Sequence, residues 1–286
     1  MDAWSSALSV DEFAAIRSAG FEPVGQVMGT AVYRTSVLSQ FVDCGYRPSL
    51  FGTGAAQTVT TADGDNGYRG YVRGRTEMRR LAMDRMAQEC RALGACGVVA
   101  TRLTMGPLGE AGNVQEYRAI GTAVTARGVT APEHPFLSHL TGQEFAQLFA
   151  AGWIPVDLVL GIAVGIRHDD WATRQMRGMF GAVQEVGGWT ELLSRTRAVA
   201  RANFHHDAAR RGGDGLLVSR VNVRVWDREC RRGNEQSDHG VEAMFLGTSI
   251  AAFHPTGAPS APAPLTIMPL DRASGPGTAR STHVVT

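Results

Sequence analysis

The sequence predicts an α+β protein made of two tandem β-α-β-β repeats, each preceded by a short capped helix, with a disordered C-terminal tail. Three observations predict this class. One stretch recurs without gaps later in the chain, each copy has a helical apolar stripe that ends at glycine, and the end of the chain is rich in proline. With 44% apolar residues, a chain of 286 residues can also bury a sizeable core.

The internal repeat is the strongest signal. At a shift of 132 places, 12 of 26 residues are identical between Leu8 to Tyr33 and Leu140 to Gly165. The match continues from Leu93 to Leu103 at a shift of 118 and from Glu116 to Val124 at a shift of 126. Small changes of shift are expected where loops between matched elements differ in length, so the folded part contains one unit twice.

Each unit begins with a short helix and a strand. Ser9 with Glu12, and Thr141 with Glu144, have the spacing of a capping box, and a glycine ends each helix, at 20 and at 152. A strand is expected over 23–33 and over 155–165. The second of these is nearly all apolar, which predicts burial on both faces.

A long helix and two strands complete each unit. Apolar residues recur at three- and four-residue steps over 76–94 and over 192–212. Two strands then follow in each copy, over 97–104 and 114–126 in the first and over 216–226 and 241–252 in the second.

The domain boundaries follow from this pattern. The first repeat spans 1–127, a linker 128–138, and the second repeat 139–253. Six of the 12 prolines fall in 254–286, among small residues, so this tail is predicted to be disordered. Residues 34–74 form a longer connection with a turn signal over 63–67.

Composition excludes several functions. All 28 basic side chains are arginine, which excludes Schiff-base lysines and the lysine of a P-loop. The net charge of +1 gives no overall attraction to nucleic acid or an anionic membrane. No apolar run is long enough to span a membrane, the start lacks the regions of a signal peptide, and the four cysteines form no CxxC pair, so a cytoplasmic protein with reduced thiols is expected.

The repeated motifs resemble the YbjQ-like family. In the second copy these motifs are the segment 159–165, the Gly-Gly-Trp-Thr-Glu-Leu-Leu run over 187–193, the segment 212–217 and the Gly247-Thr248 pair. The first copy matches the family through 27–32, 93–99 and 121–124, but it lacks the Gly-Gly-Trp run. The resemblance implies a dodecin-like β-α-β-β fold, homo-oligomers in pentameric rings, and the binding of a divalent heavy metal. In a tandem chain each copy is expected to form its own ring, which would give a pentamer with two stacked domain rings.

Residues that could bind a metal are few. His205, His206 and Asp207 are the candidates on the second long helix, although adjacent helical residues point about 100° apart and chelate one ion poorly, so a solvated helix face is the alternative. Cys230 with His239 could form a loop site, whereas Cys90 and Cys96 read as small buried side chains.

An arginine-rich face gives the alternative function. Seven arginines and three acids lie between Gly67 and Leu93, so Arg73, Arg79 and Arg80 are candidates for binding nucleic acid or another polyanion. A solvated face with intrahelical ion pairs is the competing interpretation.

Matched positions of the two copies are candidates for assembly. Glycines recur in the strands, and an arginine recurs at one place in another strand; these are Gly29 and Gly161, Gly121 and Gly247, and Arg102 and Arg220. The glycines allow close backbone approach at subunit contacts or in tight strand packing, and the arginines suit a structural fork. No catalytic motif is present, so we expect a non-enzymatic oligomeric scaffold or small-ligand-binding protein.

Overall fold

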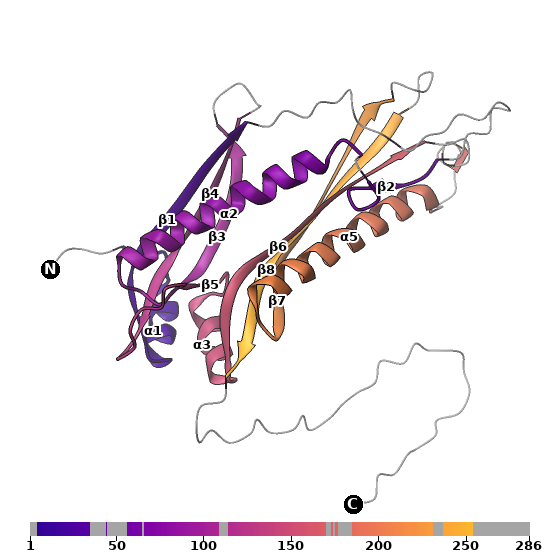
Figure 1. Ribbon diagram of the computed structural model, residues 1–286. Helices are drawn as coiled ribbons and strands as arrows, with labels where there is room; N and C mark the ends of the chain where they lie inside the picture. Colours follow the sequence, from indigo (N-terminus) through magenta and orange to yellow (C-terminus); the bar gives the residue numbers. More distant parts are fainter. Residues whose placement is uncertain are drawn as a thin grey trace, which may run out of the picture. The chain divides into compact units, whose positions relative to one another are not determined.

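The computed structural model describes residues 5–34, 44, 56–64, 66–108, 114–169, 173, 175–176, 185–230 and 237–253. This part is a mixed α+β structure with four helices, as the sequence predicts, and two four-stranded sheets (Figure 1). The sequence predicts three strands in each half; the fourth strand of each sheet is a two-residue strand, 59–60 in the predicted connection and 136–137 in the predicted linker. The predicted tail, 254–286, and position 65 of the predicted turn lie outside the described residues.

The first sheet comes from the first half of the chain. Its strand order is β1-β4-β3-β5, antiparallel except that β5 runs parallel to β3. The strands are β1 (Phe21–Arg34), β4 (Val114–Ala126), β3 (Gly97–Pro107) and β5 (Phe136–Leu137), and helix α2 (Arg69–Ala92) packs on β1 and β4.

The second sheet comes mostly from the second half. Its strand order is β2-β6-β8-β7, all antiparallel. The strands are β2 (Val59–Thr60), β6 (Trp153–His168), β8 (Ser237–Ala252) and β7 (Gly215–Glu229), and helix α5 (Gly187–Arg211) packs on β6 and β8.

The short helices α1 (Val10–Ser18) and α3 (Gly142–Ala150) begin as predicted. Both have complete capping boxes, in which the hydroxyl accepts from the N3 backbone N–H and the N3 glutamate accepts from the N-cap N–H. Both stop at a glycine with positive φ, Gly20 at 86° and Gly152 at 82°, a conformation that costs other residues more.

Helix α2 lies between the two sheets, whereas α5 covers the other face of the second sheet (Figure 1). Apolar residues of β6 and β8 pack against Val72 of α2 and Leu103 of β3. The carboxylate of Glu242, on β8, forms a buried ion pair with Arg75 of α2. The second sheet therefore has a helix of each half against its two faces.

Two matched glycines set the distance between helix and sheet. A Cβ at Gly29 would lie 1.9 Å from the carbonyl oxygen of Ala82, and one at Gly161 would lie 2.1 Å from that of Ala200. Only glycine lets each strand approach its helix backbone so closely. The close approach at these two glycines therefore lies inside each half of the chain, between strand and helix, a place that the sequence analysis does not name.

Candidate metal centre

Four buried side chains gather at one end of the second sheet. They are Cys44, His168, Cys230 and Asp238, and their ligand atoms all lie within 4.8 Å of one another. Within the described ranges, this is the group of His, Cys, Asp and Glu side chains with the geometry to hold an ion. The cluster is therefore the candidate functional site.

Three strand ends supply three of the four side chains. His168 is the last residue of β6 and stands directly opposite Asp238 on β8, so their side chains share one face of the sheet. Cys230 follows the last residue of β7, which brings it to the same end. Cys44 comes from the long connection that the sequence places between the first strand and the long helix.

The sulfur positions suit a tetrahedral ion. Cys44 Sγ lies 3.6 Å from Cys230 Sγ, too far for a disulfide, whose sulfurs are about 2.05 Å apart. Two thiolates bound to one zinc at about 2.3 Å lie roughly 3.8 Å apart at the tetrahedral angle. The observed spacing is close to this value.

The nitrogen and oxygen donors stand closer together. His168 Nδ1 and Asp238 Oδ1 are 2.8 Å apart and share a hydrogen bond. Tetrahedral zinc separates such ligand atoms by about 3.3 Å, so the pair fits an ion after a displacement of roughly half an ångström. Two thiols, one imidazole and one carboxylate form a donor set that suits zinc and similar divalent ions.

The local electrostatics keep the carboxylate ionised. Burial raises the pKa of Asp238, but hydrogen bonds from His168, Cys44, Arg228 and Cys230 outweigh this effect and leave its pKa below the usual value. Arg228 Nε donates to Asp238 Oδ2 over 3.1 Å, on the side away from His168. A deprotonated carboxylate is the form that binds a metal.

The three helix residues predicted to bind a metal lie away from the cluster and have different surroundings. His205 and His206 are exposed on α5, whereas Asp207 is buried and accepts a hydrogen bond from the backbone N–H of Leu160 over 3.1 Å. Asp207 also pairs with two arginines of its own helix. These three side chains are not among the groups that could hold an ion in the part of the chain described.

Of the two residues in the predicted loop site, Cys230 belongs to the candidate cluster and His239 does not. Successive side chains of a strand alternate between faces, so His239 lies on the face opposite to Asp238. There His239 Nε2 is 2.9 Å from a carboxylate oxygen of Asp169 and its ring packs on Trp189 of α5. The residue before His239, not His239 itself, joins the cluster.

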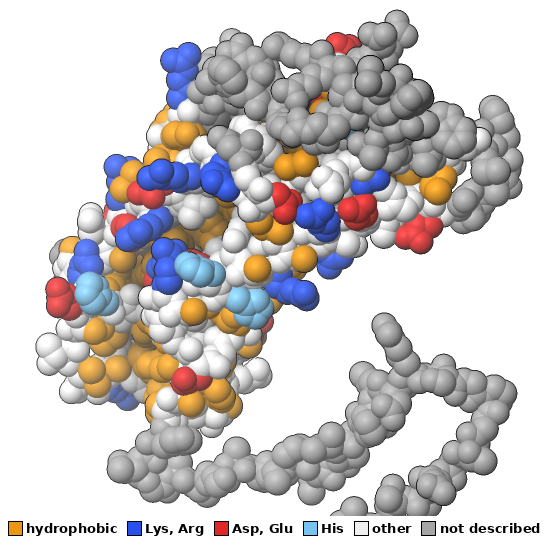
Figure 2. Space-filling view, turned by 45° about the vertical axis from the view of Figure 1, so that its right-hand side comes forward, with side chains coloured by type: hydrophobic (Ala, Val, Ile, Leu, Met, Phe, Trp, Pro, Cys, Tyr) orange, Lys and Arg blue, Asp and Glu red, His pale blue; other side chains and the backbone are white. Residues whose placement is uncertain are grey.

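The arginines predicted to bind anions are separated. Arg73 and Arg80 are exposed, with Arg80 3.9 Å from Asp84, whereas Arg79 is buried with its guanidinium over the ring of Tyr117. Burial lowers the pKa of Arg79 to about 10, which leaves it charged at neutral pH. In Figure 2, basic side chains lie among acidic and apolar ones. Polyanion binding stays a prediction.

The other matched candidates have structural surroundings. Gly121 faces Val98, and Gly247 faces the carbonyl of Leu217, both within their own sheets. Arg102 and Arg220 are exposed, each directly after a β-bulge. An assembly role for these six residues stays a prediction.

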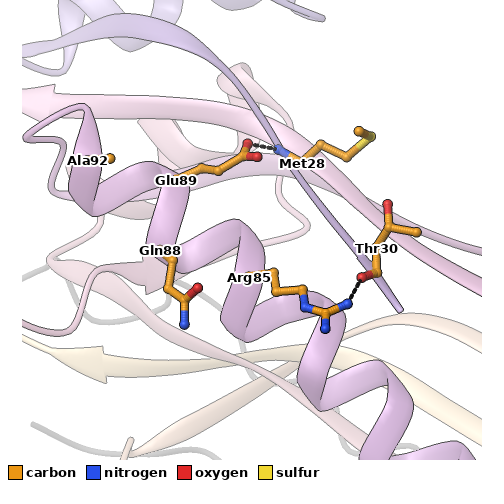
Figure 3. A pocket seen from close by; sticks show the side chains of 6 residues that line it. All are labelled: Met28, Thr30, Arg85, Gln88, Glu89 and Ala92. Carbon is orange, nitrogen blue, oxygen red and sulfur yellow. Dashed lines mark hydrogen bonds between the residues drawn. The ribbon is translucent and has the colours of Figure 1, made fainter. Parts of the chain in front are cut away.

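A shallow hollow lies beside β1, lined by α2 and strand residues (Figure 3). Glu89 accepts from the backbone N–H of Met28 over 2.7 Å, and Arg85 donates to the carbonyl of Thr30. The second half has the same pattern, in which Asp207 accepts from Leu160 and Asn203 donates to the carbonyl of Ile162 over 2.9 Å. In both halves, helix side chains therefore hydrogen-bond to backbone N–H and C=O groups at the edge of the strand. The hollow in the first half lies where these side chains reach from α2 to β1.

Sequence reasoning missed the cluster because its members are far apart. Cys44 and Cys230 are 186 residues apart, and no metal-binding spacing joins them. The available signal was strand register, since placing β6 antiparallel to β8 brings His168 opposite Asp238.

Fold and site together define an α+β protein with a candidate metal centre, and similarity to known proteins agrees with this class. A family model described as "Putative heavy-metal-binding", that of the YbjQ-like proteins, matches residues 50–127. An encapsulin nanocompartment protein of Mycobacterium tuberculosis is 30% identical over 275 residues, which cover 94% of this chain and 92% of that protein. The chain belongs to the YbjQ-like family.

No helix in the described part is both long and apolar enough to cross a bilayer.

Proposed function

We propose that this protein is a non-enzymatic, cytoplasmic, oligomeric scaffold that binds a divalent heavy metal through Cys44, His168, Cys230 and Asp238. The observation that carries the metal proposal is the buried cluster itself, with four suitable donors within 4.8 Å of one another. The bound metal would supply a cross-link of the fold and not a reactive centre.

Complete coordination by protein side chains supports a structural role. Catalytic zinc sites keep one position for water or substrate, whereas structural sites use four protein ligands. Here all four donors come from the chain and all are buried. The cluster joins the ends of three strands to the connection that carries Cys44, so bound metal would stabilise this end of the second sheet.

The oligomeric part of the proposal is supported by the family and by the relative. The mycobacterial relative is named as an encapsulin nanocompartment protein, and we extend to this chain an association with such a compartment. We also propose that the two halves are a duplication of one dodecin-like unit, since their helices and strands follow in the same order. The pentamer implied by the resemblance is part of the same hypothesis.

Metal analysis of untagged protein tests the metal centre. Elemental analysis after gel filtration should find about one zinc-class ion per chain, and C44S and C230S should each lose it. C90A is the matched control, because Cys90 is also buried but lies on the stripe of α2, away from the cluster. Metal-free wild-type protein, or a Cys44–Cys230 disulfide after purification under reducing conditions, would contradict the metal centre.

Native mass spectrometry of the same preparation tests the scaffold. The proposal expects an oligomer at micromolar concentration. A monomer would contradict the scaffold, and it would leave the metal result standing, because all four ligands belong to one chain.

A further inference from the structure

The two halves repeat one another closely enough to compare their surroundings position by position. In each half a helix carboxylate accepts a hydrogen bond from a strand backbone N–H, Glu89 from Met28 and Asp207 from Leu160, and we call these contacts the strand-edge caps. Their residues match at a shift of 132 between β1 and β6 and of 118 between α2 and α5. Strand pairing matches as well, since Met28 opposes Ile120 and Leu160 opposes Leu246 at the same places. Each contact of one half can therefore be sought in the other.

Among the described residues, one contact of the second half has no counterpart in the first half. The inner face of the second sheet, with Leu160, Ile162, Met244 and Leu246, packs on Val72 and Leu103 of the first half. On this face Glu242 pairs with Arg75 and its charge also acts on Arg79. This contact joins a sheet face of the second half to a helix and strand of the first half.

The sheet surface equivalent to that face is exposed on the first half. Met28 and Thr30 stand at the places of Leu160 and Ile162, and Ile120 at that of Leu246. Met28 is 45% exposed and its neighbour on the same face, Val32, is 51% exposed. We call this surface the outer face of the first sheet.

The opposite surface is exposed on the second half. Four valines lie on one face of β7, which is the last strand of its sheet, and α5 makes no substantial contact with this strand. Val221 stands at the place of Leu103 and Val223 at that of Met105. The exposed fractions of Val218, Val221, Val223 and Val225 are 53, 46, 37 and 57%. We call these residues the β7 valine row.

We do not expect the β7 valine row to stay exposed to solvent in the assembled protein. Four adjacent exposed valines on a long edge strand would favour uncontrolled association, and natural sheets protect such edges with charges, proline or a covering element. In the first half the equivalent residue Leu103 is covered by the second sheet. The valine row lacks this cover within the described part of the chain.

Charge matches at two positions of the exposed surfaces. Glu116 occupies the place of Glu242 on the outer face of the first sheet, and Arg197 occupies the place of Arg79 on α5. Arg197 is exposed, and the Glu116 side chain is 22% exposed. Contact between the surfaces would bring Glu116 towards Arg197, as the internal contact brings Glu242 towards Arg79; Leu193 stands at the place of Arg75, which makes the internal ion pair.

We infer that the β7 valine row and the adjoining side of α5 bind the outer face of the first sheet of a second copy of this chain. The contact repeats between chains what the two halves make within one chain. Because its two surfaces differ, it is head-to-tail and builds a ring if it closes. First and second halves then alternate around one ring, unlike the two stacked rings expected from the resemblance. This inference rests on the oligomeric scaffold proposed above.

The contact is tested by mixing two variants, each of which has one of the two surfaces disrupted. V223D places a carboxylate in the valine row, and M28D places one on the outer face; each alone should lose the oligomer seen by native mass spectrometry. Each variant keeps one surface intact, so an equimolar mixture should form a dimer of one V223D and one M28D chain. V129D, which changes an exposed valine between β4 and β5, should assemble like wild type.

The outcomes separate the two proposals. A monomeric wild type overturns the scaffold itself. An oligomeric wild type whose assembly survives both variants overturns this contact and leaves the scaffold. Loss of assembly in V223D alone, without rescue by M28D, indicates that β7 pairs with β7 of the partner and also overturns the head-to-tail contact. Formation of the mixed dimer further shows that both variants are folded.

Discussion

Helices α2 and α5 occupy matching places in the two halves but have different surroundings. Both pack on their own sheet through a glycine, yet α2 is also covered by the second sheet, whereas the other side of α5 is exposed. The side chains differ in burial for this reason, since Arg79 on α2 is buried and its counterpart on α5, Arg197, is exposed. Equivalent sequence positions therefore acquire different roles from the elements that pack against them.

The largest expected difference between the halves concerns two glutamates. E242Q removes the charge that compensates buried Arg75, so the free energy of unfolding should fall by about 3 kcal/mol. E116Q, at the matching place, changes a pair with partly exposed Arg118 and should cost the isolated chain less than about 0.5 kcal/mol. Urea denaturation of both variants measures the loss in the free energy of unfolding. Equal losses would contradict the view that Glu242 is buried by the contact between the halves and Glu116 is not.

The two helix-facing glycines should instead behave alike. G29A and G161A each force a Cβ onto a helix carbonyl, and each should lower the free energy of unfolding by roughly 2–3 kcal/mol. G106A is the control, because a Cβ there meets nothing within 4 Å. Thermal denaturation compares them, and a neutral effect at either matched glycine would argue against equivalent helix packing.

The strand-edge caps should differ in cost because one is buried. D207A leaves the N–H of buried Leu160 without its acceptor and should cost about 2 kcal/mol. E89A leaves the N–H of Met28 exposed to water, so a loss near 0.5 kcal/mol is expected. Chemical denaturation at neutral pH gives both values, and a larger cost for E89A would reverse the argument.

Cys90 makes the first half sensitive to alkali, whereas its counterpart in α5 is Ala208. Burial raises the pKa of Cys90 from 9.0 to about 12. Between these values the unfolded state binds fewer protons than the folded state, so stability falls as pH rises. Relative to C90A, wild type should lose about 1 kcal/mol more between pH 8.5 and 10. Parallel pH dependence of the two proteins in urea melts would disprove this assignment.

Prediction from sequence succeeded where the signal is local. The hydroxyl and glutamate of each capping box lie three residues apart, so the helix starts could be read directly. The long helix in the first half begins earlier than the apolar stripe indicates, at Arg69, because its first turns pack on the second sheet through Tyr71 and Val72. That contact is not visible in local periodicity.

The candidate site was predicted less well. A metal is predicted, but the candidate ligands named for it, His205, His206 and Asp207, lie on one helix, where adjacent side chains point about 100° apart. The cluster instead unites residues from β6, β8, the end of β7 and a distant connection. Only the strand register decides which of two consecutive residues, Asp238 or His239, faces the cysteines.

The sequence by itself determined the repeated order of elements, the helix caps and the glycines that allow close packing, because each depends on hydrogen bonds or sterics within a short segment. The tertiary structure alone decided which arginines are buried, where four metal-binding groups meet, and which valines remain exposed on β7. These outcomes depend on the faces that the two halves present to each other, and burial and coordination are properties of such three-dimensional contacts.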